Sequence, residues 1–422
     1  MKLTWEKIEV FLVVFLGGAT FNLVGTISIA EIYLLIISPR LYRYVKYSSF
    51  PEKKNIISLY VIYFIVQMLS ECLNGNLITN SFRGFAVTIF SFLSFIYIFS
   101  MLNKNVKLII VVLLGLVFRN VFFPNSLAED SEMSFFKFYL VPIISNLVLV
   151  ISYYMINNKR KNLAIYVVVA VGVFFMLMDS RSAGLTLVLV GFIVRFGPQL
   201  KKRIVLLPIF IVLIYGLYCV YVIKVLNHEF GGEHSYNQLA RIENPFNPFT
   251  LLMTGRAETF VAIEAISDEF LLGHGTWAKD VTGKYHIMVL TLQNSDTEGA
   301  IQRVFDEGIY SVIPAHSVIL GAGVYNGILA LLIVLLIVIL FIKIGFQAIN
   351  FNSPYIVILV RMIIGIIWTS LFSPINSFKG SLPIFFAIVL VLYINRNKNL
   401  FDIGKRHIGI QKNRVQTTIN LN

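Results

Sequence analysis

The chain has 422 residues, of which 57% are hydrophobic and 14% charged, whereas soluble domains carry about 25% charged residues. This composition and the mean hydropathy of +0.79 exclude a water-soluble globular protein, because so much exposed apolar surface would aggregate. The net charge of +13 would suit a nucleic-acid partner, so the positions of the basic residues along the chain decide its meaning.

The chain begins with Lys2 and Lys7 ahead of an apolar run, which is the arrangement of a secretory signal. Further apolar runs follow at once and no convincing cleavage site is present, so we expect an uncleaved first span. The cysteines, Cys72 and Cys219, lie inside apolar runs. They form neither a disulfide framework nor a CxxC pair for a metal or for redox chemistry.

Apolar runs long enough to cross a bilayer as helices, which takes about 20 residues, continue along the chain. We predict about twelve transmembrane helices, at residues 7–22, 25–39, 56–73, 84–102, 106–123, 135–156, 163–178, 183–195, 204–225, 318–342, 356–372 and 382–394. The predicted fold class is therefore an all-α polytopic membrane protein. Its expected parts are nine helices in 1–225, a large external loop subdomain at 226–317, three helices in 318–394 and a basic cytoplasmic tail at 395–422.

Basic residues follow this topology when both termini are placed in the cytoplasm. The tail and the predicted inner connections carry most of them, including the runs 159–161 and 201–203. The short outer loops hold only Arg83, Arg181 and Lys379. This bias is the positive-inside rule, and it explains the net charge without nucleic acid.

Residues 226–317 interrupt the succession of spans with a polar segment in which acidic residues outnumber basic ones. Large apolar residues recur there at steps of three and four, at Phe260, Ile263, Ile266 and Phe270. Such spacing predicts an amphipathic helix that lies on the bundle or on the membrane surface. We expect His274 and His286, in the same segment, to be exposed loop residues.

Known catalytic patterns are absent from the sequence, which has no GxxxxGK[ST] loop, no HExxH, no GxSxG and no DxD. This argues against an ATP-driven pump and against a sugar-nucleotide enzyme, and we expect no metal and no cofactor. Ionisable residues remain at the predicted outer surface, namely Asp179, Arg181, Arg256 and His316. Helix ends at one face of a bundle can converge, so we expect a shared cavity at the outer leaflet.

Three motifs follow one another in the second half of the chain: DSRSAG at 179–184, TGRAETF at 254–260 with FLLGHG at 270–275, and AHSVILGAGVYNGILALL at 315–332. Their order, spacing and shared side of the membrane resemble the O-antigen polymerase and ligase superfamily. The resemblance covers about residues 179–393, and the first half matches only in topology. The chain departs from the family at Ser317, where many members have Asn, and in lacking a proline before Leu271.

The resemblance implies a C-type glycosyltransferase-like fold in the bacterial cytoplasmic (inner) membrane, with the active site facing the periplasm or cell exterior. It implies transfer of a glycan from undecaprenyl diphosphate to a sugar hydroxyl at that face, without nucleotide or metal. The partners it implies are an undecaprenyl-diphosphate-linked oligosaccharide, membrane lipids and a chain-length regulator.

A departing lipid diphosphate is best stabilised by guanidinium groups, which stay charged and bind phosphate bidentately. We therefore predict this role for Arg181 and Arg256, and predict that His316 accepts the proton of the attacking hydroxyl. The predicted substrate-binding residues are Asp179, Arg361 and Lys379.

Each of these assignments has an alternative. Arg181 could pair with Asp179 as an anchor at the membrane interface, Arg256 could be a solvated loop residue, and His316 could cap a helix. Lys379 could be an ordinary lysine at the membrane interface, and Arg361 could pair internally. At the level of the whole protein, we predict a polymerase of lipid-linked repeats. The alternatives are a ligase that hands finished polymer to lipid A core sugars, and a non-enzymatic transporter. A transporter should show coupling charges near the bilayer midplane and repeated halves, and neither is clear in the sequence.

Overall fold

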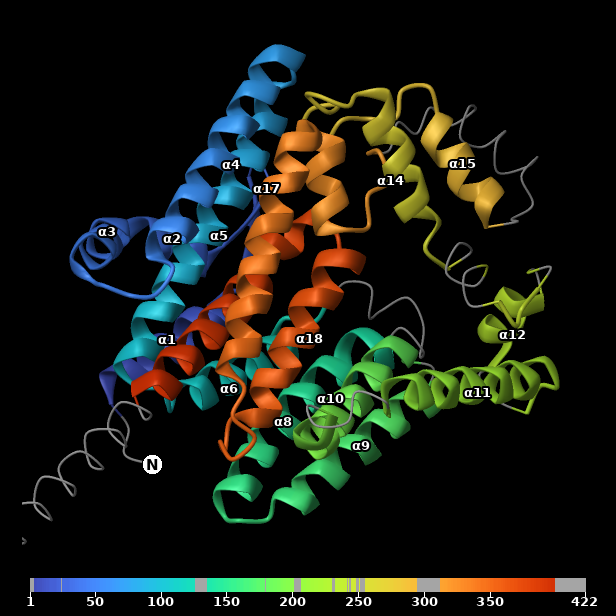
Figure 1. Cartoon of the computed structure of the whole chain (residues 1–422). Coiled ribbons are helices and arrows are strands. Elements are labelled where there is room, and N and C mark those ends of the chain that lie inside the picture. Colours follow the sequence, from blue (N-terminus) through green and yellow to red (C-terminus); the bar gives the residue numbers. More distant parts are fainter. Residues whose placement is uncertain are drawn as a thin grey trace, which may run out of the picture.

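The structure is a computed structural model. It describes residues 4–23, 25–125, 135–178, 180–200, 206–229, 232–240, 242, 244–247, 250, 255–293 and 312–398. These residues form helices and, apart from an isolated bridge, one small two-stranded sheet (Figure 1). The prediction of an all-α protein is confirmed for this part of the chain.

Six helices of the described chain are long and apolar enough to cross a membrane. They are α4 (Lys53–Asn74), α5 (Ile78–Lys104), η2 with α8 (Phe136–Asn157), α10 as far as Gln199, α17 (Val318–Ala348) and the run Ile375–Lys398. Shorter apolar helices are α6 (Leu108–Phe122), α9 (Lys161–Leu177) and α18 (Ile356–Phe372). A membrane-embedded helical protein is therefore supported, whereas the number of twelve spans stays a prediction.

The other elements are short, lie outside these spans or form part of one of them. They are α1 (Trp5–Leu16), β1 (Thr20–Asn22), β2 (Thr26–Ser28), α2 (Ile29–Ile36), α3 (Ser38–Tyr47), η2 (Phe136–Leu140), α8 (Val141–Asn157), α10 (Arg181–Leu200), α11 (Leu206–Leu226), α12 (Gly232–Ala240), α14 (Ala257–Asp268), α15 (Lys284–Leu292) and η3 (Ile375–Phe378).

The predicted span 25–39 is wrong as a single helix. Its first residues pair with β1 in an antiparallel hairpin, and Ser28 then caps α2 in a capping box with Glu31. A cap of this kind fixes the helix start, and α2 has only 8 residues. Such a helix rises about 12 Å, less than half of the roughly 30 Å of hydrocarbon.

The centre of the bundle is built by α5, α17 and the helix 382–398. Phe95 of α5 meets Phe341 of α17 edge to face with ring centroids 5.5 Å apart, and Phe341 stacks on Phe386 at 4.0 Å. All three rings are fully buried. Aromatic contacts of these geometries add to the energy of area burial, so they join segments that are far apart in the sequence.

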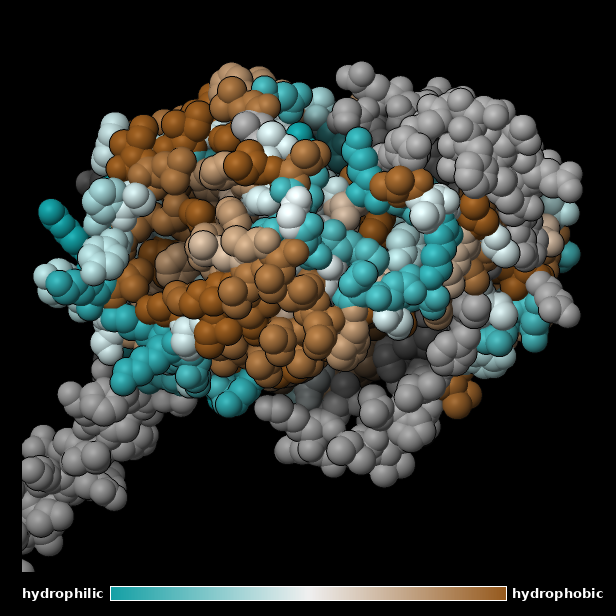
Figure 2. Space-filling view, turned by 90° about the horizontal axis from the view of Figure 1, so that it is seen from above, coloured by the Kyte–Doolittle hydropathy of each residue, from teal (hydrophilic) through white to brown (hydrophobic). Residues whose placement is uncertain are grey.

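The outer flank of α4 is apolar and exposed, as a lipid-facing helix should be. Ile62, Ile65, Leu69 and Leu73 are between 46% and 66% exposed. Seen from above, wide apolar areas cover the flank of the molecule while polar residues gather over its middle (Figure 2). Apolar patches of this size on a protein surface are accounted for by contact with lipid.

Connections that the sequence places in the cytoplasm lie together at one end of the bundle. Lys161, at the start of α9, donates a hydrogen bond of 2.7 Å from Nζ to the backbone oxygen of Phe351, between α17 and α18. Gly197, near the end of α10, packs against the ring of Phe351. The shared end agrees with the predicted alternation of helix directions, and its cytoplasmic location stays a prediction.

The predicted span 318–342 is not one continuous helix. Asn326 (φ −130°) and Gly327 (φ 78°, ψ −178°) leave the helical conformation inside α17. A Cβ on Gly323 would lie 2.9 Å from Cδ1 of Leu331, although eight residues of straight helix would separate them by about 12 Å. Residues 318–325 therefore form a half-helix that turns back beside residues 328–348 (Figure 1). The latter run is long enough to span the membrane by itself.

Candidate functional site

The turn within α17 is completed by residues 270–275, the FLLGHG segment. A break in a helix leaves backbone groups without their usual partners. Here the carbonyls of Val324 and Tyr325 accept hydrogen bonds from the backbone N–H groups of His274 (2.8 Å) and Gly275 (2.9 Å). In return, the N–H of Ile328 donates to the carbonyl of Phe270 at 2.9 Å. The external segment thus supplies the bonds that the helix loses.

Glycines make this close backbone contact possible. A Cβ on Gly327 would lie 2.0 Å from the carbonyl oxygen of Leu271, and one on Gly273 would lie 2.6 Å from the Gly327 nitrogen. Both glycines also have positive φ, +78° and +67°, which glycine adopts without strain. The FLLGHG and GAGVYNG motifs are therefore two halves of one structure.

A buried carboxylate, Glu71, holds the same segment from the side of α4. Its Oε1 accepts hydrogen bonds from the backbone N–H of Thr276 at 2.7 Å and from the Thr276 hydroxyl. Its Oε2 accepts from Nδ2 of Asn76 at 2.9 Å and from Oγ of Ser81 at 2.8 Å. Glu71 is only 4% exposed, and a charge buried so deeply needs such donors.

Sequence reasoning did not single out Glu71. The sequence did contain a signal, because Glu71 is an acidic residue near the end of the apolar run of α4, which ends at Asn74. Ionisable residues within transmembrane segments are costly unless they are paired or functional. Neighbouring Ser70 belongs to the same attachment, because its hydroxyl donates to the carbonyl of Leu272 at 2.6 Å.

The amphipathic helix expected between Arg256 and Leu272 is present as α14 (Ala257–Asp268). Its buried residues are Ala257, Val261, Ala262, Ala265 and Ile266. Of the predicted apolar face, Ile263 and Phe270 are 51% and 53% exposed. The small alanines let α14 approach the half-helix of α17 closely, where Ile266 reaches Gly323. One face of α14 therefore packs on the bundle through its small side chains, and the exposed Ile263 and Phe270 are available to contact the membrane surface.

His274 is half-buried rather than exposed as expected. Its Nε2 bonds to the carbonyl of Ala265 at 2.8 Å and lies 3.3 Å from the Tyr285 hydroxyl. That hydroxyl donates to Asp268 at 2.7 Å, as does Nζ of Lys284 at 2.6 Å. The Lys284 hydrogen bond, with that of Tyr285, holds the pKa of Asp268 below its usual range. This cluster ties α14 to α15.

Arg256 and the segment that contains His316 both reach the last turn of α18. Arg256 is the N-cap residue of α14, and its Cζ lies 5.7 Å from the ring centroid of Phe372, within range of a cation–π interaction. His316 is exposed and immediately precedes Ser317. The Ser317 hydroxyl donates to the carbonyl of Ser370 at 2.9 Å. Arg256 and Ser317, the residue after His316, therefore both contact the last turn of α18.

Ser317, and not His316, caps the half-helix of α17. Its Oγ accepts the backbone N–H of Leu320 at 3.2 Å, which is the usual role of an N-cap serine. The alternative in which His316 serves as the helix cap is therefore wrong. Asparagine caps helices as well as serine, so the departure from the family at this position leaves the cap intact.

Two helix N-termini point at the end of α18. The half-helix of α17 begins there through Ser317, and α14 begins there through Arg256. Both helices then run in the same direction, because Ile266 near the end of α14 packs on Gly323 near the end of the half-helix. Helix N-termini carry partial positive charge and free N–H groups. With one guanidinium and one exposed imidazole beside them, they suit an anion and a proton transfer.

Arg181 is joined to a different element. It begins α10, its Nη1 donates to the hydroxyl of Tyr221 at 2.8 Å, and its guanidinium lies 5.8 Å from the centroid of that ring. This contact links α10 to α11. Asp179 lies outside the described residues, so its predicted role and the alternative of an Asp179–Arg181 pair stay open. A shared site of Arg181 and Arg256 stays a prediction.

The predicted substrate-binding residues Arg361 and Lys379 lie away from Phe372. Arg361 is nine residues before Ser370 on α18, about 14 Å along the axis, and its Nη1 approaches Gly365. Lys379 lies 3.0 Å from Oε1 of Glu31 and donates to the carbonyl of Thr26 at 2.9 Å. Their roles in binding substrate stay predictions.

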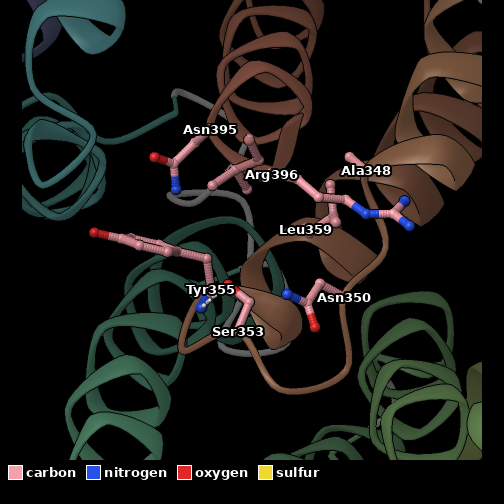
Figure 3. A pocket seen from close by; sticks show the side chains of 8 residues that line it. Ala348, Asn350, Ser353, Tyr355, Leu359, Asn395 and Arg396 are labelled. Atoms are coloured by element: carbon pink, nitrogen blue, oxygen red, sulfur yellow. Dashed lines mark hydrogen bonds between the residues drawn. The ribbon is translucent and has the colours of Figure 1, made fainter. Parts of the chain in front are cut away.

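A small pocket opens at the opposite end of α17 and α18 (Figure 3). It is lined by Ala348, Asn350, Ser353, Tyr355, Leu359, Leu392, Asn395 and Arg396. This end also holds the connection between Ala348 and Ile356, so the pocket is a full helix length from Ser317. In the described chain, no group of three His, Cys, Asp or Glu residues could hold a metal ion.

The fold and the site define a helical membrane protein that gathers helix N-termini and cationic groups at one end of its bundle. No protein-family model, curated protein or solved structure matches this chain. What the protein does must therefore be argued from its own residues.

Proposed function

We propose that this protein is a glycosyltransferase of the O-antigen polymerase type at the outer face of the bacterial inner membrane. It would transfer a glycan from undecaprenyl diphosphate to a hydroxyl of a second lipid-linked repeat. The observation that supports this proposal most is that Arg256 and Ser317, the neighbour of His316, contact the last turn of α18, where α14 and the half-helix of α17 both begin. Residues from two separate motifs of the family resemblance contribute to that one place.

In the proposed reaction, the bond between the anomeric carbon of the donor glycan and the diphosphate oxygen breaks. A bond from the acceptor hydroxyl oxygen to the same carbon forms. The electron pair leaves with undecaprenyl diphosphate, and the hydroxyl proton goes to Nδ1 or Nε2 of His316. A neutral imidazole has one nitrogen that accepts a proton, and the His316 side chain is exposed.

Arg256 would stabilise the negative charge that develops on the departing diphosphate. Guanidinium N–H groups in one plane match two phosphate oxygens at once. Donors that are already oriented toward the developing charge usually give the largest contribution to catalysis. The guanidinium of Arg256 lies 5.7 Å from the ring centroid of Phe372, a cation–π contact that helps to hold it at the end of α18. Arg181, Asp179, Arg361 and Lys379 are proposed as further contacts to the substrate and its lipid.

The proposal is tested by reconstituting the protein in vesicles with defined lipid-linked repeats and following polymer length and release of undecaprenyl diphosphate. Arg256→Lys keeps the charge and loses the bidentate fork, so it should retain part of the activity, whereas Arg256→Ala should retain almost none. Arg160→Ala, an exposed change at the opposite end, should behave as wild type.

Three outcomes would reject this assignment. Wild-type polymer from Arg256→Ala would remove the diphosphate role of this residue. Transfer to lipid A core sugars, with none to a second repeat, would make the protein a ligase. A protein that transfers to neither acceptor is not a glycosyltransferase of this type.

A further inference from the structure

A second group of basic side chains surrounds the β1–β2 hairpin. Lys379 contacts both Glu31 and the carbonyl of Thr26 in β2. Arg119, in the last turn of α6, lies against the residues before β1, with Nη1 3.6 Å from the Cβ position of Gly17. Arg83 of α5 lies against the hairpin turn, with Cγ 3.0 Å from the Cβ position of Gly25. Three helices or turns thus bring cations to one small hairpin.

Positive charge exceeds negative charge in this group among the described residues. Glu31 is its one carboxylate, and both of its oxygens are engaged: Oε1 with Lys379 at 3.0 Å and Oε2 with the backbone N–H of Ser28 at 2.7 Å. The structure gives Arg119 neither a hydrogen bond nor an ion pair with a described residue, although its side chain is partly buried. An anionic ligand would supply charge-assisted hydrogen bonds to this partly buried guanidinium.

The basic group lies at the same end of the bundle as Arg256 and His316, but separate from them. The 3₁₀ helix η3 stands between the two, because Ile375 packs on Gly321 of the half-helix and Lys379 follows η3 on its other side. Four residues of 3₁₀ helix and five of α-helix connect Lys379 to His316, a path of about 15 Å. The two cationic places are therefore separated by a distance comparable with the length of a short oligosaccharide.

We propose that the group of Arg83, Arg119 and Lys379 binds the diphosphate of the acceptor, the second lipid-linked oligosaccharide. This inference rests on the proposed function. A polymerase binds two lipid diphosphates at once, and only the diphosphate of the donor is released in the reaction. The acceptor's diphosphate stays bonded and lies one repeat away from the hydroxyl that reacts. Its site needs cations without a general base, and that is the composition of the group around the hairpin.

Native mass spectrometry of the detergent-solubilised full-length protein, titrated with undecaprenyl diphosphate, counts bound lipids without requiring activity. Wild type should bind two molecules. Arg119→Gln and Arg256→Ala should each bind one, and the double variant none. Arg160→Gln, at the opposite end, should still bind two. Arg83→Gln changes an exposed residue and should raise the second half-saturating concentration about 10-fold, the effect of one charge-assisted contact.

The outcomes separate this inference from the proposed function. If wild type binds only one lipid, and neither Arg119→Gln nor Arg83→Gln changes that binding, the acceptor site is overturned and the proposed donor site is not affected. A lipid lost in Arg119→Gln but not in Arg256→Ala upholds the acceptor site and rejects the donor role of Arg256. Equal occupancy by phosphatidylglycerol or undecaprenyl monophosphate would identify a general phospholipid site and overturn the inference, as would no binding at all. If Arg119→Gln fails to elute as a single species, Arg83→Gln decides.

Discussion

Gly327→Ala tests whether the contact between residues 270–275 and the turn of α17 holds the outer part of the protein together. An added Cβ would lie 2.0 Å from the carbonyl oxygen of Leu271, so one of the two backbones must move by about 1 Å or more. The φ and ψ of +78° and −178° also belong to a region that is essentially restricted to glycine. Gly75 provides a matched control, because its φ is +60° but nothing lies within 4 Å of its Cβ position.

The expected costs differ several-fold. Gly75→Ala should cost about 1 kcal/mol, the usual penalty for an alanine in the left-handed region. Gly327→Ala carries a conformational strain of about 1–3 kcal/mol and loses the three backbone hydrogen bonds that Phe270, His274 and Gly275 make with the turn, at about 1 kcal/mol each. The sum, on the order of 5 kcal/mol, is comparable with the whole stability of many domains.

The assay is thermal unfolding of the purified protein in detergent. The measured quantity is the fraction of protein that remains monodisperse on size exclusion after heating to each temperature. Gly327→Ala should lower the midpoint strongly and Gly75→Ala only slightly. Gly216→Ala, an exposed helix position with an open Cβ site, should not lower it. A Gly327→Ala midpoint equal to that of Gly75→Ala would refute the argument that this docking stabilises the turn.

Three further predictions follow from the same contacts. Glu71→Gln places an amide N–H against donors and should lower stability by about 1–3 kcal/mol, measured in the same assay; an unchanged midpoint would contradict the role of the carboxylate. His316→Gln and His316→Ala should both lower the transfer rate about 10²-fold, and a Gln variant with most of its activity would end the base assignment. Since the pKa of Asp268 is lowered in the folded state, its contact with Lys284 stabilises the protein above about pH 4 and is lost as the pH falls further. The acid loss of stability should therefore shrink in Asp268→Asn, and an identical pH profile would contradict this contribution.

Much of the helical architecture was predictable, because long apolar runs and the distribution of basic residues report directly on membrane helices. The turn in α17 was not. Apolar residues flank Asn326 and Gly327 on both sides. The hydropathy profile therefore shows residues 318–325 and 328–348 as one continuous apolar run. Only the bonds to residues 270–275, more than fifty positions earlier, make the turn favourable, and such long-range partners leave no periodic signal.

The candidate site was predictable in part. Arg256 and His316 were selected from their types, motifs and expected side of the membrane. The structure places Arg256 and Ser317, the neighbour of His316, at the last turn of α18, and the catalytic roles stay predictions. The helix α14 was predicted, but its contact through small alanines was not, because only the large apolar residues were counted in the periodic pattern. Glu71 was missed because nothing in the local sequence indicates that Thr276, about two hundred residues later, would donate to it.

The attachment of residues 270–275 to the turn of α17 is made almost entirely by backbone atoms. Such an attachment places few demands on side chains, apart from the absence of one at Gly273 and Gly327. Substitutions at Leu271, Leu272 or Val324 would keep every one of these bonds. A distant chain could therefore preserve the same arrangement after most of its residues had changed. The spacing of Gly273, Gly275 and Gly327, rather than overall identity, is the trait by which such a homologue would be recognised.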